Sequence, residues 1–369
     1  MASMSHLYLA ATGQNRGKTT VAVGLVDGFL SRGLSTGFIK PVGQRTVIEH
    51  GVAADEDAVL MKSVFDLPEP LSLMSPVHIP RGFTKAYIAG DVVEDLAARV
   101  RTAFERLTAE RQIVLVEGTG HAGVGAVIGL SNAVVAAMLG TPAVIVSEGG
   151  VGRPIDEIVL NAALFAAHGV AVAGAIVNKV QTDAQPGIAR TLERGLARHG
   201  IALLGILPYR PILSNPTLGM ILEGVHGERI HPGPDLDRVI DNVAIGAMEP
   251  GHMLQRIGPG TLVIVPGDRQ DAILALTAAH MAGNGQGVAL GLVLTGGYRP
   301  PHGVLAEIRR ADLFATLVHE DTYPVASEIH DLLVKTHAAD LEKVATIKAL
   351  VAEHLDIDRI LEVAGPSVG

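Results

Sequence analysis

From residue 6 to about residue 207, short aliphatic runs alternate with stretches of helical period. Continuous apolar strands separated by helices are typical of a parallel sheet that is covered on both faces. The sequence therefore predicts a doubly wound, parallel-sheet α/β domain in this part of the chain. The expected strands lie at 7–11, 36–41, 113–117, 143–147, 172–178 and 202–207. The expected helices lie near 18–32, 53–65, 91–109, 154–168 and 186–199.

The regular alternation stops after residue 208, where prolines stand among glycines and polar residues, a composition typical of a linker. A second alternation follows. Its strands are expected at 261–265, 289–295 and 315–319, and its helices at 269–281, 324–336 and 340–354. We therefore expect a first domain at 1–208, a linker at 209–234, and a smaller α/β domain with C-terminal helices at 235–369.

Composition excludes several classes of function. The chain has no cysteine, which excludes disulfides, thiolate metal sites and a cysteine nucleophile. The net charge of −9 and the lack of a basic run argue against a nucleic-acid partner. The uncharged stretch 118–147 contains six glycines and a proline, so a buried core explains it better than a membrane span. No signal-like N-terminus is present, and a cytoplasmic protein is expected.

The strongest local signal is a strand that runs into a glycine-containing loop ending in Gly17-Lys18-Thr19-Thr20, followed by a helix. Such a loop offers backbone N–H groups to phosphates, a lysine to the terminal phosphate and a hydroxyl to Mg²⁺. The first glycine position of the usual pattern is Thr12 here, and the alternative is a plain helix start with a solvated lysine. The residues expected to bind a mononucleotide are Gly13, Gln14, Asn15, Arg16, Gly17, Lys18, Thr19 and Thr20.

Polar residues also follow other strands or begin helices near the carboxyl edge of the predicted sheet, where ligands gather. Lys40 could stabilise a transferring phosphoryl group or hold an anionic substrate, or it could be an edge lysine that reaches water. Glu117 is a candidate Mg²⁺ ligand, whereas Asp57 could be a second ligand or a residue that favours a helix start. Asn178 could contact an adenine edge or simply form a turn.

In order along the chain, these residues resemble the dethiobiotin synthetase family. The shared motifs are the GKT loop, KPV at 40–42, DAV at 57–59, VEG-x-G at 116–120, NKV at 178–180 and LLGILPY at 203–209. The resemblance implies ATP and Mg²⁺. It implies that Lys18 and Thr19 hold phosphates and metal, that Asp57 and Glu117 are the other metal ligands, that Asn178 and Pro208 line an adenine pocket, and that Lys40 faces a reacting carbamate.

The chain also departs from that family. A hydroxyl residue after KPV is replaced by Gly43-Gln44-Arg45, which alters the expected substrate loop, and the loop ahead of GKT is shorter. Cobyrinic acid a,c-diamide synthase shares this first domain, of the type also named AAA_26. Its amidotransferase half needs a cysteine nucleophile, so glutamine-dependent amidation by this chain alone is not expected.

The remainder resembles a DRTGG domain. Residues 267–276, GDRQDAILAL, keep Asp268-Arg269, but Gln270-Asp271-Ala272 replace the Thr-Gly-Gly of the motif. A dethiobiotin synthetase-like domain followed by a DRTGG domain is the arrangement found at the N-terminus of long bacterial phosphotransacetylases. The sequence ends before a catalytic acetyltransferase domain, so acetyl transfer is not expected.

Two functions remain open. One is an ATP-dependent ligase in which Lys18, Lys40 and Mg²⁺ assist phosphorylation of a small-molecule carboxylate or carbamate before an amine attacks. The other is a regulatory protein that binds a nucleotide without turnover and passes that state, through the DRTGG domain, to a protein partner or across a dimer. The resemblance further implies a homodimer, and neither nucleic acid nor a membrane is an expected partner.

Overall fold

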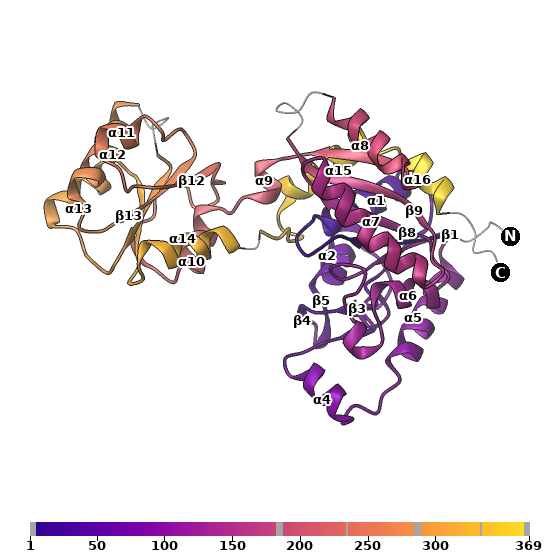
Figure 1. Cartoon of the computed structure of the whole chain (residues 1–369). Coiled ribbons are helices and arrows are strands. Elements are labelled where there is room, and N and C mark those ends of the chain that lie inside the picture. Colours follow the sequence, from indigo (N-terminus) through magenta and orange to yellow (C-terminus); the bar gives the residue numbers. More distant parts are fainter. Residues whose placement is uncertain (1–4, 182–186, 234, 284–288, 333, 365–369) are drawn as a thin grey trace. The chain divides into compact units, whose positions relative to one another are not determined.

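The structure is a computed structural model that describes residues 5–181, 187–233, 235–283, 289–332 and 334–364. The chain forms two compact units (Figure 1). The first unit combines Met1–Tyr209 with Thr336–Gly369, and the second unit is Arg210–Lys335. The second unit is therefore inserted, in chain order, into the first.

The first unit is built on a six-stranded parallel sheet in the order β10-β9-β8-β1-β7-β2. Its strands are β1 (Ser5–Ala11), β2 (Thr36–Ile39), β7 (Ile113–Glu117), β8 (Ala143–Glu148), β9 (Val172–Val180) and β10 (Leu203–Pro208). The central strands consist mainly of buried aliphatic residues, as the continuous apolar runs predict. The doubly wound α/β prediction is confirmed, and β1 lies in the middle of the sheet.

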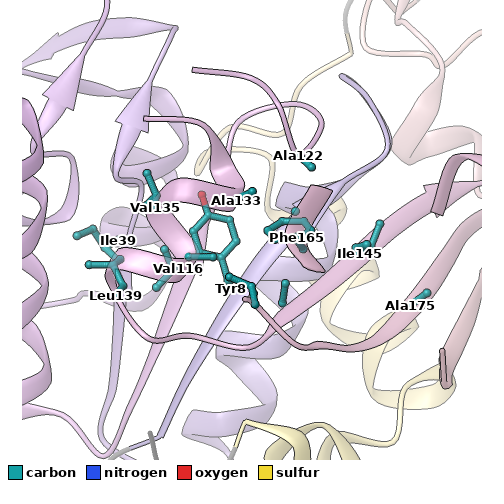
Figure 2. Close-up of a cluster of buried hydrophobic side chains, with 14 of the residues drawn as sticks. Tyr8, Ile39, Val116, Ala122, Ala133, Val135, Leu139, Ile145, Phe165 and Ala175 are labelled. Carbon is teal, nitrogen blue, oxygen red and sulfur yellow. The ribbon is translucent and has the colours of Figure 1, made fainter. Parts of the chain in front are cut away.

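Successive residues of a strand point to opposite faces of the sheet. On one face, Tyr8 and Ala10 of β1 join an apolar cluster with side chains of the helices that cover it, including Phe165 (Figure 2). The buried Tyr8 hydroxyl donates a hydrogen bond to Asn132 Oδ1 at 2.8 Å. Leu7 and Leu9 are equally buried and face the opposite side. Both faces of the sheet are thus covered.

Helices and small strands complete the first unit. The helices are α1 (Lys18–Leu30), α2 (Glu56–Phe65), α3 (Leu71–Met74), α4 (Phe83–Ala89), α5 (Leu96–Glu110), α6 (Asn132–Met138), α7 (Gly152–Ala167), α8 (Ile188–Ala197), α15 (Leu341–His354) and α16 (Ile357–Val363), with the 3₁₀ turn η1 (Ala126–Ile128). Strand β3 (Val42–Gly43) pairs with β6 (Val77–His78), and β4 (Thr46–Glu49) with β5 (Val52–Asp55). Asp55 caps α2 by accepting a hydrogen bond from the Asp57 amide, so this helix begins later than residue 53.

The structure differs from the expected boundary at the C-terminus, because α15 and α16 belong to the first unit. Helix α15 packs directly on α1, where a Cβ added to Gly24 would lie only 2.2 Å from the Val351 side chain. Lys348 of α15 also pairs with Asp27 of α1 at 2.9 Å. An apolar helix needs a partner surface, but its place in the sequence does not say which surface that is.

The second unit has a five-stranded sheet in the order β11-β15-β14-β13-β12. Its strands are β11 (Glu228–His231), β12 (Asn242–Ile245), β13 (Thr261–Pro266), β14 (Gly291–Thr295) and β15 (Phe314–Leu317), of which only β11 is antiparallel to its neighbour. Its helices are α9 (Pro211–Ser214), α10 (Leu218–Gly224), α11 (Pro250–Leu254), α12 (Gln270–Ala282), α13 (His302–Arg310) and α14 (Thr322–Asp331). The smaller α/β domain is confirmed, but the expected linker at 209–234 contributes α9, α10 and β11 to it.

Within the described ranges, none of the helices has both the length and the apolar character that crossing a bilayer requires.

Candidate functional site

The glycine-containing loop lies between the end of β1 and the start of α1. Gly17 has φ +85°, a conformation that a residue with a side chain rarely adopts, and a Cβ there would lie 1.9 Å from Asn178 Nδ2. Asn15 also has a positive φ of 58°, which asparagine tolerates better than most residues. The loop thus curls tightly ahead of α1 and presents the N-terminus of that helix, whose free amide groups favour anions.

Four of the predicted residues, two of them buried and two half-buried, form a polar cluster beside this loop. The Lys40 ammonium donates to Asp57 Oδ2 at 2.5 Å and to Glu117 Oε1 at 3.1 Å. The Thr19 hydroxyl lies 3.1 Å from both Asp57 Oδ1 and Glu117 Oε1. Lys40 and Glu117 end neighbouring strands and are almost wholly buried. The convergence of strand ends that the sequence predicts is therefore present.

Lys18, at the first position of α1, is 8% exposed, and among the described residues its ammonium makes no hydrogen bond or ion pair. Burial, together with repulsion from Lys40, lowers the pKa of Lys18 from 10.5 to about 8, and the carboxylates of Glu117 and Asp57 partly oppose this change. A buried cation without a paired anion is costly. The site therefore favours an anionic ligand that would pair with Lys18.

Glu117 has a carboxylate oxygen that could bind a metal ion. Its Oε2 is buried and makes no hydrogen bond. Burial raises the pKa of Glu117 to about 7, although Lys40 pulls it down. Within the described ranges no cluster of three or more His, Cys, Asp or Glu residues could hold a metal alone. Two carboxylates and the Thr19 hydroxyl suit Mg²⁺, which commonly takes most of its ligands from water and phosphate oxygens.

Asn178 lies beside the loop, and its side chain bonds backbone groups there. Its Nδ2 donates to the carbonyl oxygen of Arg16 at 3.2 Å, and its Oδ1 accepts from the Lys179 amide at 2.8 Å. The side chain therefore stabilises the loop at residues 12–18, which we call the phosphate loop. Its contact with adenine stays a prediction. Pro208 ends β10, which is separated from β1 by β9 and β8. Its place in an adenine pocket also stays a prediction.

Gly13, Gln14, Asn15 and Arg16 form the body of the loop, and Thr20 lies in the first turn of α1. Sequence reasoning missed a second group of charged residues on the other side of this loop. Glu148 ends β8, and Glu157 lies on α7. Glu148 could have been found by the strand-end rule that selects Glu117. No comparable signal marks Glu157, which lies inside a helix.

Comparison with known proteins agrees with this architecture. Residues 5–217 match the AAA_26 family, described as an AAA domain, and residues 220–332 match the DRTGG domain. Phosphate acetyltransferase from Pseudomonas putida is 29% identical over 373 aligned residues, which cover 96% of this chain and 51% of that protein. Phosphate acetyltransferase from Pseudomonas aeruginosa is 26% identical, with 98% of this chain and 52% of that protein covered.

The chain thus spans about half the length of the curated relatives it matches. A structure of the CBS and DRTGG domains of the regulatory region of Clostridium perfringens pyrophosphatase, complexed with diadenosine tetraphosphate, covers 49% of this chain and 86% of that chain. Its identity is 15% and its TM-score is 0.28, so the resemblance is weak. By the match over residues 5–217, the chain belongs to the AAA_26 family of AAA domains, and a DRTGG domain follows that domain in the sequence.

Proposed function

We propose that this protein is a nucleotide-binding regulatory protein whose first unit binds Mg·ATP and whose DRTGG unit carries the response. The observation that carries the nucleotide proposal is the largely buried Lys18 side chain at the N-terminus of α1, whose ammonium makes no ion pair with any described residue. A triphosphate would supply the missing negative charge. Thr19, Asp57 and Glu117 would hold Mg²⁺, which shields phosphate charge when it is bound.

Two facts favour regulation over the ligase reaction expected from the dethiobiotin synthetase resemblance. The curated relatives named above, whose matches cover almost all of this chain, are phosphate acetyltransferases. In addition, Lys40 bonds the two candidate metal carboxylates and does not lie free to face a carbamate. The small-molecule substrate, the homodimer and a protein partner stay predictions.

Chain order supplies a route for such a response. The second unit is joined to the first after β10 and before α15, and α15 packs on α1, the helix that begins at the phosphate loop. A movement of α1 on nucleotide binding would therefore reach the element that follows the DRTGG unit. This proposal requires that the bound nucleotide alter the exchange of backbone amides beyond the loop itself.

Calorimetric titration of Mg·ATP into the wild-type chain and Lys18→Ala tests the nucleotide assignment, and equal affinity of the two proteins would refute it. Hydrogen exchange with and without Mg·ATP tests regulation. We expect changed protection in α15 and in residues 210–335, and a change confined to the loop would count against a relay. Release of ADP on adding a pool of diamines and carboxylates would instead favour the ligase reaction.

A further inference from the structure

The phosphate loop is tied through its own side chains to two glutamates outside the cluster described above. Thr12, at the first position of the loop, donates its hydroxyl hydrogen to Glu157 Oε2 at 2.8 Å. Arg16, near the other end of the loop, forms an ion pair with Glu148, and its Nη2 lies 3.5 Å from Glu157 Oε1. Both ends of the loop are therefore held on the same side by carboxylates of β8 and α7.

Neighbouring cations complete this network. Lys179 lies 3.2 Å from Glu148 Oε2 and also donates to the carbonyl oxygen of Asn15 at 2.8 Å. Arg153, one turn before Glu157 on α7, donates to Glu157 Oε1 at 2.7 Å. Each glutamate is thus shared by two cations, because Arg16 contacts both. The two carboxylates are neutralised beside a loop that is expected to receive a polyanion.

Two loop positions where glycine would be the easier residue are occupied by other residues. Thr12 stands at the first glycine position of the usual pattern, and Asn15 takes a left-handed conformation that glycine adopts more readily. Gly13 leaves room for the Arg16 guanidinium, since a Cβ there would lie 3.2 Å from Arg16 Nε. Cross-links from side chains therefore restrict the shape of the loop at both of its ends.

We propose that Glu148 and Glu157 are positioning residues for nucleotide binding, which act through Arg16 and Thr12 to hold the phosphate loop in its binding conformation. The inference rests on the proposed binding of Mg·ATP. The proposal predicts whether neutralising either glutamate weakens or tightens the binding of Mg·ATP. A carboxylate near a bound polyanion repels it, so neutralising that carboxylate would tighten binding if charge alone mattered. A positioning role predicts weaker binding.

The test is calorimetric titration of Mg·ATP into the full chain carrying Glu157→Gln or Glu148→Gln, compared with the wild type. We expect each variant to bind about tenfold more weakly, the usual consequence of losing one charge-assisted hydrogen bond. Glu94→Gln is the matched control, because it removes one carboxylate charge from an exposed ion pair with Arg99 in the same unit. Its affinity should stay at the wild-type value.

Thr12 provides a second, independent pair of variants if a glutamine variant fails to fold. Thr12→Val removes the hydroxyl and should weaken binding, whereas Thr12→Ser keeps it and should weaken binding less. Thr12→Val combined with Glu157→Gln should cost less than the sum of the two single changes, because the first removes and the second weakens the same hydrogen bond. Thermal unfolding of every variant separates this coupling from a general loss of stability.

The outcomes distinguish the two proposals. A wild-type chain that does not bind Mg·ATP would overturn the proposed function. A wild-type chain that binds, together with glutamine variants that bind equally or more tightly, would overturn the positioning role and leave the nucleotide site intact. Additive effects of the Thr12 and Glu157 variants would also count against positioning through the hydroxyl.

Discussion

Lys18 allows a test in which stability and ligand affinity should change in opposite directions. Burial, with a further contribution from Lys40, lowers its pKa from 10.5 to about 8. At pH 7 the lysine is charged in both the folded and the unfolded chain, so the folded state bears the whole cost of the lowered pKa. At about 1.36 kcal/mol for each pKa unit, that cost is about 3 kcal/mol.

The pH dependence of this stability cost follows from the lowered pKa of Lys18 in the folded protein. The cost is complete below pH 8 and disappears as the pH rises towards 10.5, where the unfolded lysine also loses its proton. Lys18→Met keeps most of the side-chain volume and removes the charge. We therefore expect this variant to unfold at a temperature several degrees higher at pH 7, with a gain of at most about 3 kcal/mol, and to lose ATP binding.

Thermal unfolding and calorimetric titration of ATP on the same protein measure both effects. Lys85→Met is the matched control, because Lys85 is exposed on α4 and should influence neither quantity. A lower unfolding temperature for Lys18→Met would show that the Lys18 ammonium stabilises the ligand-free protein. That result would refute the argument that this ammonium lacks a compensating anion when no ligand is bound.

Three further predictions concern the same unit. Lys40→Met should allow the nucleotide-free protein to bind Mn²⁺ in a calorimetric titration, because the ammonium now bonds both candidate metal carboxylates. With EDTA present, the affinity for ATP should fall as the pH rises above about 8, by up to about tenfold per pH unit, as Lys18 loses its proton; a constant affinity from pH 7 to 9.5 would contradict this. Gly24→Ala should destabilise the chain by about 1–3 kcal/mol in a thermal melt, because its methyl group would collide with Val351, whereas Gly152→Ala, with open space around it, should not.

The sheet of the first unit could be predicted closely because its strands are continuous apolar runs. The expected strand at 113–117 is found as Ile113–Glu117, and the one at 143–147 extends by a single residue. The destination of α15 could not be predicted in this way. Its apolar residues indicate that it packs on another element, and the space left by Gly24 together with the Lys348–Asp27 pair explains why it packs on α1.

In the candidate site, too, the sequence pattern predicts which residues lie together but not the contacts that each side chain makes. Lys40 and Glu117 could be placed together because both follow parallel strands, whose carboxyl ends meet at one edge of the sheet. Whether the Lys18 ammonium forms an ion pair depends on its distances to neighbouring carboxylates, which residue spacing in the sequence does not determine. The same holds for Asn178, whose amide contacts the loop carbonyl and not open space.

The charge on the two sides of the loop explains why an anion should bind between them. On one side of the loop, Lys18 makes no ion pair with any described residue, although Lys18 and Lys40 match Asp57 and Glu117 in number. On the other side, three cations contact the two carboxylates of Glu148 and Glu157. One unpaired lysine and one excess cation thus lie beside a short loop at the N-terminus of α1, which itself favours anions. A nucleoside triphosphate would neutralise this charge, and the resulting pull on α1 would act on α15, the helix that packs against it. Under the proposed function, binding at the loop and a response after the DRTGG unit would therefore both follow from this neutralisation.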